Sequence, residues 1–275
     1  MGLEANDARA MLKWLVEAGA DEALAEEPIN RYAVAAEAAP AISVAALDAA
    51  IREAPARRQE LAPRAPAVIA PTAATATARE LAAGCQTLDE LRAALDKFDG
   101  CALKVTAKST VFADGAADAP VMLIGEAPGR DEDLEGLPFV GRSGQLLDRM
   151  LNSIGLDRRT NAYITNVIFW RPPGNRPPTP EEAALCAPFL LRHIELKQPK
   201  VLVLLGGTPV KHILNIEEGI TRTRGRWGRH VVNSQEIPAL PMFHPAYLLR
   251  QPSAKRQTWQ DLLSLKLKLR ELGVF

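Results

Sequence analysis

The chain has 275 residues, 47% hydrophobic and 24% charged, with a formal net charge of +0 at pH 7. This balance is typical of a soluble globular protein and excludes collagen-like and membrane-embedded classes, because the apolar runs are far shorter than the roughly 20 residues that cross a bilayer. Taken whole, the neutral charge also argues against a nucleic-acid-binding protein.

The cysteine count and the first residues indicate a compartment. The chain has three cysteines, an odd number, which argues against a disulfide framework and favours a reducing environment. The first residues do not combine a basic start with an apolar run, so we expect no secretion signal and a cytoplasmic location.

The chain divides into three parts by composition. Residues 1–30 contain a short amphipathic helical pattern, which fits either a docking element or a frayed terminal helix. Residues 31–83 are rich in alanine and proline, and this composition predicts a mobile linker. We expect a globular domain over residues 84–275, beginning with a helix over 87–98 that Thr87 and Glu90 cap as a capping box.

From residue 119 onward, short apolar runs alternate with helical patterns, as in a parallel sheet built from βα units. The predicted strands cover residues 121–124, 163–167, 200–205 and 238–243. Helices are predicted over 144–154, over 180–196, in a short segment after Pro209, and over 253–272. The fold class is therefore an α/β protein, a three-layer α/β/α sandwich with a central, mainly parallel four-stranded sheet.

Polar motifs follow each of the four predicted strands, where ligands bind in open parallel sheets. These motifs are Gly125-Glu126-Ala127-Pro128-Gly129, Thr165-Asn166, Gly206-Gly207-Thr208, and His244-Pro245-Ala246-Tyr247-Leu248-Leu249-Arg250. Taken singly, each has a plain structural explanation: a glycine turn is common, an asparagine can hold a turn, and a histidine at a strand end is often structural. Their convergence on one edge of the sheet favours a functional site.

Charge is distributed unevenly along the chain. Residues 220–270 contain ten Lys or Arg and two Asp or Glu, whereas residues 1–80 contain eight basic and twelve acidic residues. The neutral total therefore conceals a basic C-terminal segment suited to phosphate contacts, although part of it can equally be a solvated helix face.

The ordered motifs resemble those of the family 4 uracil-DNA glycosylases. The resemblance extends from about Phe98 to the C-terminus. It is carried by the first glycine-rich motif, by Pro138-Phe139-Val140-Gly141, by Thr165-Asn166-Val167, by Arg171-Pro172-Pro173-Gly174-Asn175-Arg176, and by the closing motif that begins at His244.

This resemblance implies an enzyme of base excision repair that hydrolyses the N-glycosidic bond of an extruded deoxyuridine. It implies that Glu126, Asn166 and His244 are catalytic: Glu126 stabilises the sugar cation and positions or activates the water, Asn166 reads the uracil edge, and His244 stabilises the departing base. The alternative holders of the water are Asp131, Glu132 or backbone groups. The expected uracil pocket consists of Gly125, Glu126, Ala127, Gly129, Phe139, Asn166 and His244. The expected DNA-binding residues are Arg171, Arg222, Arg224, Arg226, Leu248, Leu249 and Arg250.

The sequence departs from this family at its iron–sulfur cluster. The family's four cysteine positions align with Phe98, Cys101, Trp170 and Cys186, so only two ligands are present. We expect no metal and no cofactor, with Cys101 and Cys186 as buried thiols near the two aromatic residues. The alternative is a [4Fe–4S] cluster that recruits Cys85 as a third cysteine ligand.

The expected partner is uracil-containing DNA, single- or double-stranded, with no membrane and no obligate protein partner, and the protein is expected to be a monomer, associated with the bacterial nucleoid while it acts. Two other functions remain open. One is a uracil-binding relative that becomes cross-linked to abasic DNA, which is disfavoured because no inserted basic loop follows Arg176. The other is a non-catalytic DNA-binding repair module.

Overall fold

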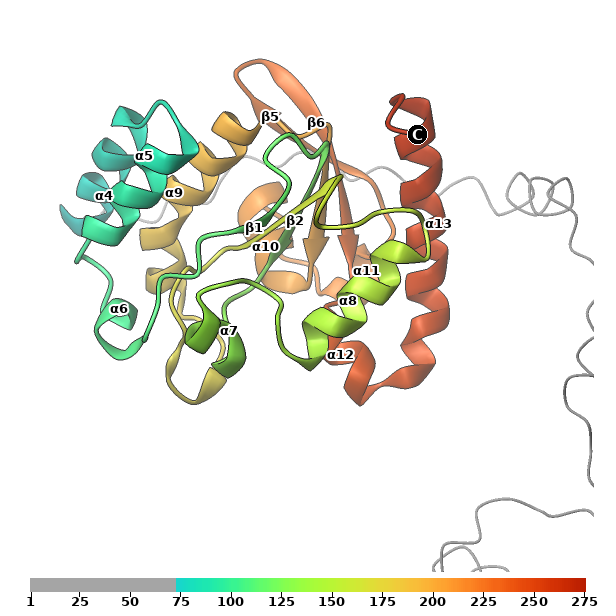
Figure 1. The fold of residues 1–275 in the computed structure, drawn as a ribbon, viewed down its shortest axis with the longest axis horizontal. Helices are drawn as coiled ribbons and strands as arrows, with labels where there is room; N and C mark the ends of the chain where they lie inside the picture. Colours follow the sequence, from blue (N-terminus) through green and yellow to red (C-terminus); the bar gives the residue numbers. More distant parts are fainter. Residues whose placement is uncertain (1–72) are drawn as a thin grey trace, which may run out of the picture. The chain divides into compact units, whose positions relative to one another are not determined.

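The computed structural model describes residues 73–275, drawn in colour in Figure 1. The helix expected within residues 1–30 and most of the linker expected over 31–83 lie outside the described residues. No helix among residues 73–275 has the length and apolar character needed to cross a membrane.

The described chain folds into a sheet flanked by helices. The strands are β1 (Asp114–Gly115), β2 (Val121–Gly125), β3 (Ala162–Asn166), β4 (Val201–Leu205), β5 (Gly228–Val232) and β6 (Gln235–Met242). The helices are α4 (Ala73–Gly84), α5 (Leu88–Lys97), α6 (Leu103–Thr106), α7 (Arg130–Glu135), α8 (Arg142–Asn152), α9 (Pro180–Lys197), α10 (Gly207–Leu214), α11 (Ile220–Thr223), α12 (Pro245–Arg250) and α13 (Lys255–Glu271), with 3₁₀ turns at Pro173–Asn175 and Pro252–Ala254.

The sheet order is β1-β3-β2-β4-β6-β5. The four predicted strands correspond to β2, β3, β4 and β6, which pair in parallel, so the predicted core of the sheet is confirmed. The sheet has six strands rather than four because β1 and β5 add antiparallel edges. The two-residue β1 and the largely polar β5 are too short or too polar to stand out as strands in the sequence.

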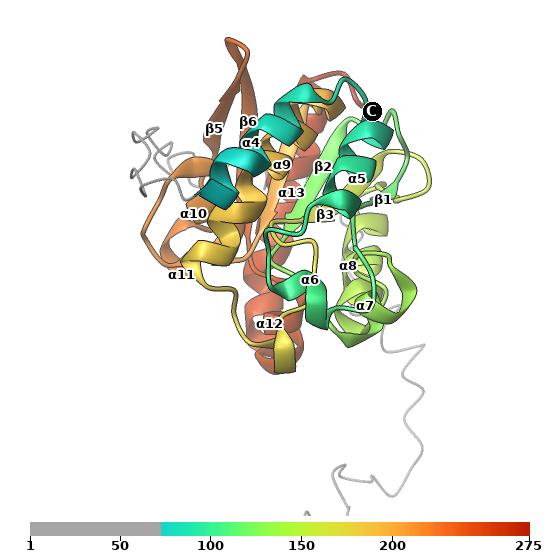
Figure 2. The same ribbon diagram turned by 90° about the vertical axis from the view of Figure 1, so that its left-hand side faces the viewer.

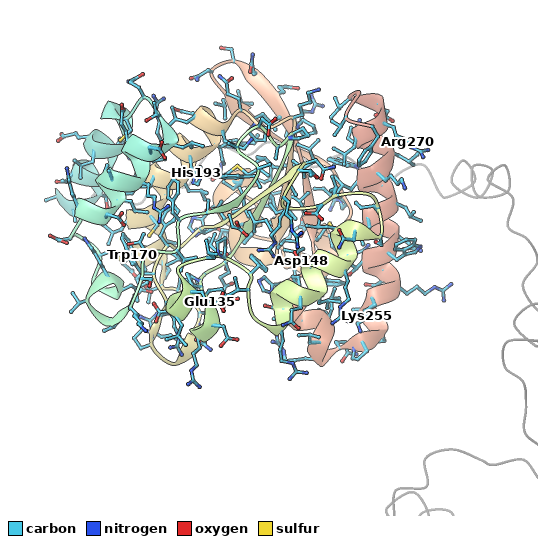
Figure 3. All side chains as sticks on the ribbon, in the orientation of Figure 1. Glu135, Asp148, Trp170, His193, Lys255 and Arg270 are labelled. Atoms are coloured by element: carbon cyan, nitrogen blue, oxygen red, sulfur yellow. The ribbon has the colours of Figure 1, made fainter. Side chains whose placement is uncertain are left out.

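Alternating residues of the buried strands contact opposite helix layers, as the period of two in a strand requires. Met122, Ile124 and Leu204 pack with α4, α5, α9 and α10 on one face. Val121, Leu123 and Val203 pack with α8 and α13 on the other. Figures 1 and 2 show these layers, and Figure 3 shows Trp170 and His193 on the α9 side and Lys255 and Arg270 at the two ends of α13.

Local sequence signals define the long helices. Thr179 and Glu182 form the predicted capping box at the start of α9, and Pro180 occupies its first position. At α5 the Thr87 hydroxyl accepts a hydrogen bond from the Glu90 backbone N–H. The Glu90 carboxylate accepts from the Gln86 N–H rather than from that of Thr87, so the predicted box at α5 is only half formed.

The ordered domain begins earlier than the sequence indicated. Residues 73–83, placed at the end of the linker, belong to helix α4, whose Ala78 and Ala82 are buried in the core shared with α9. Alanine has the highest helix propensity, and this stretch contains no proline, so only the proline-rich segment before it fits a linker composition. Small side chains also allow α4 to pack closely against its neighbour.

Candidate active site

A pocket of about 240 Å³ opens at the carboxyl ends of the parallel strands. After β2 the chain continues to β3, which lies on one side of the β2–β4 pair. After β4 it continues to β5 and β6, which lie on the other side, so the strand order reverses between β2 and β4. Ligands of open α/β sheets bind at such a reversal. The pocket is lined by Glu126, Ala127, Pro128, Gly129, Glu132, Phe139, Ser143, Asn166, Pro172, Asn175, Arg176, His244 and Ala246.

Glu126 is held across the reversal point by a residue from the neighbouring strand end. The Thr208 hydroxyl, at the start of α10, donates a hydrogen bond of 2.5 Å to Glu126 Oε2. This bond fixes one carboxylate oxygen and leaves Oε1 available to a ligand. Thr208 belongs to one of the polar motifs that follow the predicted strands, but the sequence predicted no role for it.

Asn166 presents an unsatisfied hydrogen-bonding atom to the pocket. The residue is 1% exposed, and its Oδ1 has no hydrogen-bond partner among the described residues. A buried amide oxygen without a partner is costly unless a ligand supplies the donor. A Cβ at Gly125 would overlap both this oxygen and the Phe139 ring, so glycine is required where these two side chains meet.

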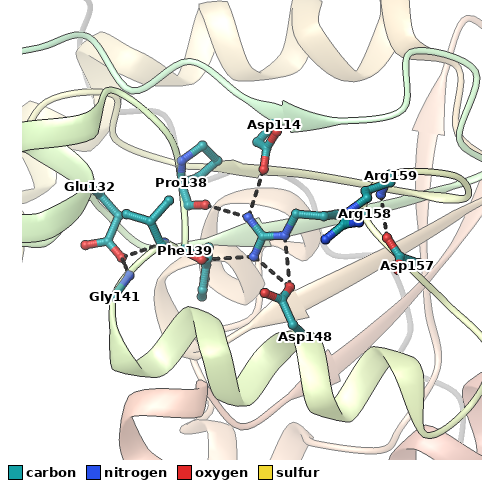
Figure 4. Close-up of polar contacts among 10 residues, drawn as sticks. Asp114, Glu132, Pro138, Phe139, Gly141, Asp148, Asp157, Arg158 and Arg159 are labelled. Carbon is teal, nitrogen blue, oxygen red and sulfur yellow. Dashed lines mark hydrogen bonds and ion pairs between the residues drawn. The ribbon is translucent and has the colours of Figure 1, made fainter.

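Phe139 is buried in a left-handed backbone conformation, with φ at +57°. This conformation is uncommon for a large residue and has to be stabilised by its surroundings. The Arg158 guanidinium donates to the carbonyls of Pro138 (3.2 Å) and Phe139 (2.9 Å), and it forms ion pairs of 2.8 Å with Asp114 and Asp148 (Figure 4).

Glu132 holds the other side of the same loop. Its Oε1 accepts from the backbone N–H groups of Val140 and Gly141, and its Oε2 accepts from that of Gly129, each at 3.1 Å. This carboxylate therefore ties the glycine-rich turn to the Phe139 loop. Because both of its oxygens are engaged, Glu132 is better suited to positioning the loop than to activating water.

His244 faces the pocket as a neutral imidazole. Burial, with a smaller effect of Arg250, lowers the pKa of His244 to about 4. Its Nδ1 accepts a hydrogen bond of 3.1 Å from the Ala246 N–H, so the proton of the neutral ring resides on Nε2. The ring lies 5.3 Å from that of Phe139, centroid to centroid. His244 can therefore donate from Nε2 to an acceptor in the pocket.

The structure brings most of the expected pocket residues together. Glu126, Ala127, Gly129, Phe139, Asn166 and His244 all line the cavity. Gly125 lies behind it and leaves room for its neighbours. Sequence reasoning missed Thr208 and Arg158 as supporting residues. The threonine directly follows a predicted strand end and was open to detection, whereas Arg158 reaches the Phe139 loop through a non-local contact with no sequence signal.

Two residues expected to bind DNA are buried instead. Arg224 is 6% exposed and forms an ion pair with Asp261, so it supports the packing of α13 and is not available to phosphates. Leu248 is 1% exposed and packs in the core beneath α12, so it cannot act as a wedge between bases. In the sequence, both residues stood beside exposed neighbours of the same type, which local pattern alone does not separate.

The other expected DNA-binding residues are at least partly exposed. Leu249 (40% exposed) and Arg250 lie on α12, which begins directly after His244. Arg222 is exposed on α11, and Arg226, half-buried, lies 3.6 Å from Glu218. Arg171 donates to Asn175, which lines the pocket.

The position of the family's cluster does not fit a four-ligand metal group. Cys101 and Cys186 are fully buried, and a hydrogen bond from Cys186 lowers the pKa of Cys101, while the same bond and burial raise the pKa of Cys186. Phe98 packs on Phe189 with ring centroids 5.2 Å apart, and Trp170 donates to Thr110.

The third cysteine does not complete a ligand set. The Cys85 thiol donates to the Leu81 carbonyl at 3.2 Å within its own helix turn. Within residues 73–275 there is no group of three or more His, Cys, Asp and Glu side chains arranged to hold a metal ion. Two thiols and two large aromatic side chains therefore occupy this region, a set that does not fit the four ligands of a [4Fe–4S] cluster.

The fold and pocket define an α/β enzyme that accepts a planar heterocycle. An aromatic wall, a buried amide acceptor and an imidazole donor match the face and the polar edges of a nucleobase, and Arg176 also lines the pocket.

Comparisons with known proteins are specific on this point. The model of the family described as "UDG: Uracil DNA glycosylase superfamily" matches residues 112–263, and the chain belongs to this superfamily. The chain is 39% identical to the type-4 uracil-DNA glycosylase of Archaeoglobus fulgidus over 186 residues, 64% of this chain and 90% of that protein. It is 39% identical to the Thermotoga maritima enzyme of the same name (64% and 92%) and 36% identical to that of Saccharolobus solfataricus (65% and 85%).

Proposed function

We propose that Glu126, Asn166 and His244 carry out the reaction of this uracil-DNA glycosylase, which hydrolyses the N-glycosidic bond of deoxyuridine in DNA. Water adds to C1′ of the sugar, the bond from C1′ to the base nitrogen breaks, and uracil and an abasic site are released. The observation that carries this assignment is the buried Asn166 Oδ1, which has no hydrogen-bond partner within residues 73–275 and lies in one pocket with Phe139 and His244.

Base recognition is proposed to depend on Asn166 and Phe139. The unpartnered Oδ1 accepts from the N3–H of uracil, and the amide nitrogen donates to a neighbouring carbonyl of the base. The Phe139 ring supplies the stacking surface. Ala127 and Gly129 line the wall without bulky side chains, and Gly125 lets the ring and the amide approach each other.

Bond cleavage develops positive charge on the sugar and negative charge on the base, and the two ends need separate stabilisation. The neutral His244 donates its Nε2–H to the uracil O2 as that oxygen becomes anionic. Glu126, fixed by Thr208, faces the cationic sugar and orients the attacking water. A neutral donor suits this role because it can stabilise the oxyanion by a hydrogen bond and keep its own proton.

DNA is proposed to contact the surface around the pocket through Arg171, Arg222 and Arg226 and through the exposed α12 residues Leu249 and Arg250. Leu249 is the residue suited to enter the space left by the extruded base, because it is the exposed leucine of its pair. Arg224 and Leu248 have no direct role in this proposal.

The protein is further proposed to act without a metal cofactor, as a cytoplasmic monomer. The residues at the cluster position support the first point, since they provide two thiols where four ligands are needed. Iron and acid-labile sulfide, measured on anaerobically purified protein, are expected to be far below stoichiometric. Stoichiometric iron and sulfide with a visible absorbance band would overturn the proposal that the protein acts without a metal cofactor.

The monomeric state is tested by light scattering, which is expected to give the mass of one chain.

The activity is tested with a uracil-containing oligonucleotide, treated with alkali after incubation. We expect strand cleavage at the uracil, and no cleavage of the same strand carrying cytosine or thymine. An uncleaved strand would remove the enzyme assignment and favour a non-catalytic DNA-binding module. A heat-stable protein–DNA adduct on a denaturing gel would favour the cross-linking alternative. No loop with a histidine is inserted between Asn175 and α9, so the structure offers nothing in favour of the cross-linking alternative.

A further inference from the structure

A second cavity, of about 290 Å³, lies between α8 and α13 beside α12. It is lined by Leu146, Arg149, Met150, Ser153, Leu248, Lys255, Thr258, Trp259 and Leu262, and we call it the α8–α13 groove. Its floor is apolar, because Met150, Leu248 and Leu262 are buried in the core on this face of the sheet.

Trp259 is the unusual residue of this groove. Its side chain is 44% exposed, although tryptophan is buried to a large extent in most folded proteins. An exposed indole next to an apolar floor offers a flat stacking surface that the fold itself does not use.

The charge of the groove has one sign. Arg149 and Lys255 line it, and no carboxylate from residues 73–275 does. The acidic residues nearest in sequence to these lining residues are engaged elsewhere: Asp148 pairs with Arg158, and Asp261 is buried against Arg224. The groove therefore presents positive charge around an aromatic surface, and this combination suits nucleic acid strands.

The groove continues the surface of the proposed active site. His244 caps the N-terminus of α12, Leu249 and Arg250 are exposed on this helix, and Leu248 of the same helix forms part of the groove floor. Figure 1 shows α12 beside α8 and α13, and Figure 3 shows Lys255 at the end of α13 near α12, with Arg270 at the opposite end.

We propose that the α8–α13 groove binds the DNA strand next to the extruded uracil nucleotide. Trp259 stacks on a base of that strand, and Arg149 and Lys255 contact its phosphates. This inference rests on the proposed function and extends it, because it assigns a subsite for a flanking nucleotide outside the base pocket. The occupant follows from the charge complementarity and from continuity with α12.

The test compares two single-stranded substrates under single-turnover conditions. One is a long strand with uracil at its centre, and the other is trimmed to one nucleotide on each side of the uracil. For Trp259→Ala, we expect the enzyme concentration at half-maximal rate to rise about tenfold on the long strand, the order of one lost base stack, with an unchanged maximal rate. The trimmed strand should show no difference from wild type.

Charge and structure are controlled separately. Arg149→Ala and Lys255→Ala should each reduce the salt dependence of binding to the long strand by about 0.7 in log–log slope, as expected for one lost phosphate contact. Phe275→Ala removes another exposed aromatic, and Lys200→Ala removes an exposed lysine that precedes β4, at the amino edge of the sheet, so both should behave as wild type.

The outcomes separate this inference from the activity itself. Wild-type protein that leaves uracil in place contradicts the proposed function. Active wild type with an unaffected Trp259→Ala variant overturns the groove assignment alone, and so does an equal loss on long and trimmed strands. Concentration-dependent dimerisation that Trp259→Ala abolishes would also overturn it, because the groove would then bind a second copy.

Discussion

His244 illustrates how one residue's surroundings determine its chemistry. The ring is desolvated, and a backbone N–H occupies Nδ1, so the neutral form with Nε2–H is present over the physiological pH range. Protonation of the ring would place a positive charge in this buried site, and the loss of solvation disfavours that charge. In the proposed mechanism, this environment provides a hydrogen-bond donor for the leaving base without any proton transfer from the enzyme.

This protonation state predicts a specific pH dependence. Because the pKa of His244 is lowered to about 4, its titration leaves the single-turnover rate unchanged from about pH 8 down to about pH 5. The rate should fall only as the pH approaches 4. The measurement is a pH–rate profile at saturating enzyme. A His244-dependent inflection near pH 6.5, absent in His244→Gln, would show that the ring titrates like an exposed histidine and contradict the assignment.

Arg158 is predicted to be a positioning residue that acts through Phe139. Arg158→Ala removes both hydrogen bonds that hold the Phe139 loop, and we expect a ten- to hundredfold lower rate, which corresponds to about 1–3 kcal/mol for such contacts. The double variant with Phe139→Ala should be little worse than Phe139→Ala alone, because both changes affect one element. Additive losses would indicate a separate structural role. The exposed neighbour Arg159, whose backbone contacts Asp157, provides the control Arg159→Ala (Figure 4).

At the scale of elements, the site consists of strand ends and turns held together by a few long-range bonds. Thr208 joins the ends of β2 and β4, Glu132 joins the glycine-rich turn to the Phe139 loop, and Arg158 joins that loop to the segment before β3. Each bond restrains a short segment that contributes to the pocket. The geometry of the pocket therefore depends on these polar contacts as well as on the packing of side chains such as Phe139.

Helix α12 contains two adjacent leucines with opposite predicted roles. Leu248→Ala creates a cavity in the core and should lower the free energy of unfolding by about 2–5 kcal/mol. Leu249→Ala should leave stability within about 0.5 kcal/mol and lower the rate on duplex more than on single-stranded substrate, because only a duplex has a stack to fill. Thermal unfolding and single-turnover rates on both substrates test this pair. Similar stability losses in the two variants would contradict the burial difference.

At the scale of the whole molecule, the sequence predicted what depends on local pattern. Apolar runs indicated the four parallel strands, and motif position placed Glu126, Asn166 and His244 at one edge. It did not separate Leu248 from Leu249, or Arg224 from Arg222, because burial of one member of a like pair depends on the packing of α12 and α13. Contacts such as Arg158 with Phe139 are set by the tertiary fold.

The folded molecule also contains a histidine that predicts its acid sensitivity. His193 is fully buried, stacked on Phe112 and hydrogen-bonded to the Tyr163 hydroxyl, and burial, with a smaller effect of Lys197, lowers its pKa to about 3. The His193 side chain therefore binds a proton near pH 6.5 in the unfolded chain but only near pH 3 in the folded chain. The stability that this histidine contributes is therefore fully present above pH 6.5 and is lost, by up to about 1.4 kcal/mol per pH unit, as the pH drops through this window.

Replacing this histidine with a residue that does not titrate tests the linkage. His193→Gln retains a partner for Tyr163, and we expect its free energy of unfolding to depend less steeply on pH between 6.5 and 3 than that of wild type. Denaturant unfolding at a series of pH values, with both proteins compared first at pH 8, gives the two slopes. Identical slopes would show that His193 does not contribute to acid destabilisation.

The pocket at the ends of β2, β3, β4 and β6 is proposed to remove uracil through His244 and its neighbours. Single-turnover rates of uracil release for wild type, His244→Ala and the control Lys200→Ala test this assignment. We predict that His244→Ala is slower by about two to three orders of magnitude, with unchanged thermal unfolding, and that Lys200→Ala equals wild type. Equal rates for wild type and His244→Ala would contradict the account.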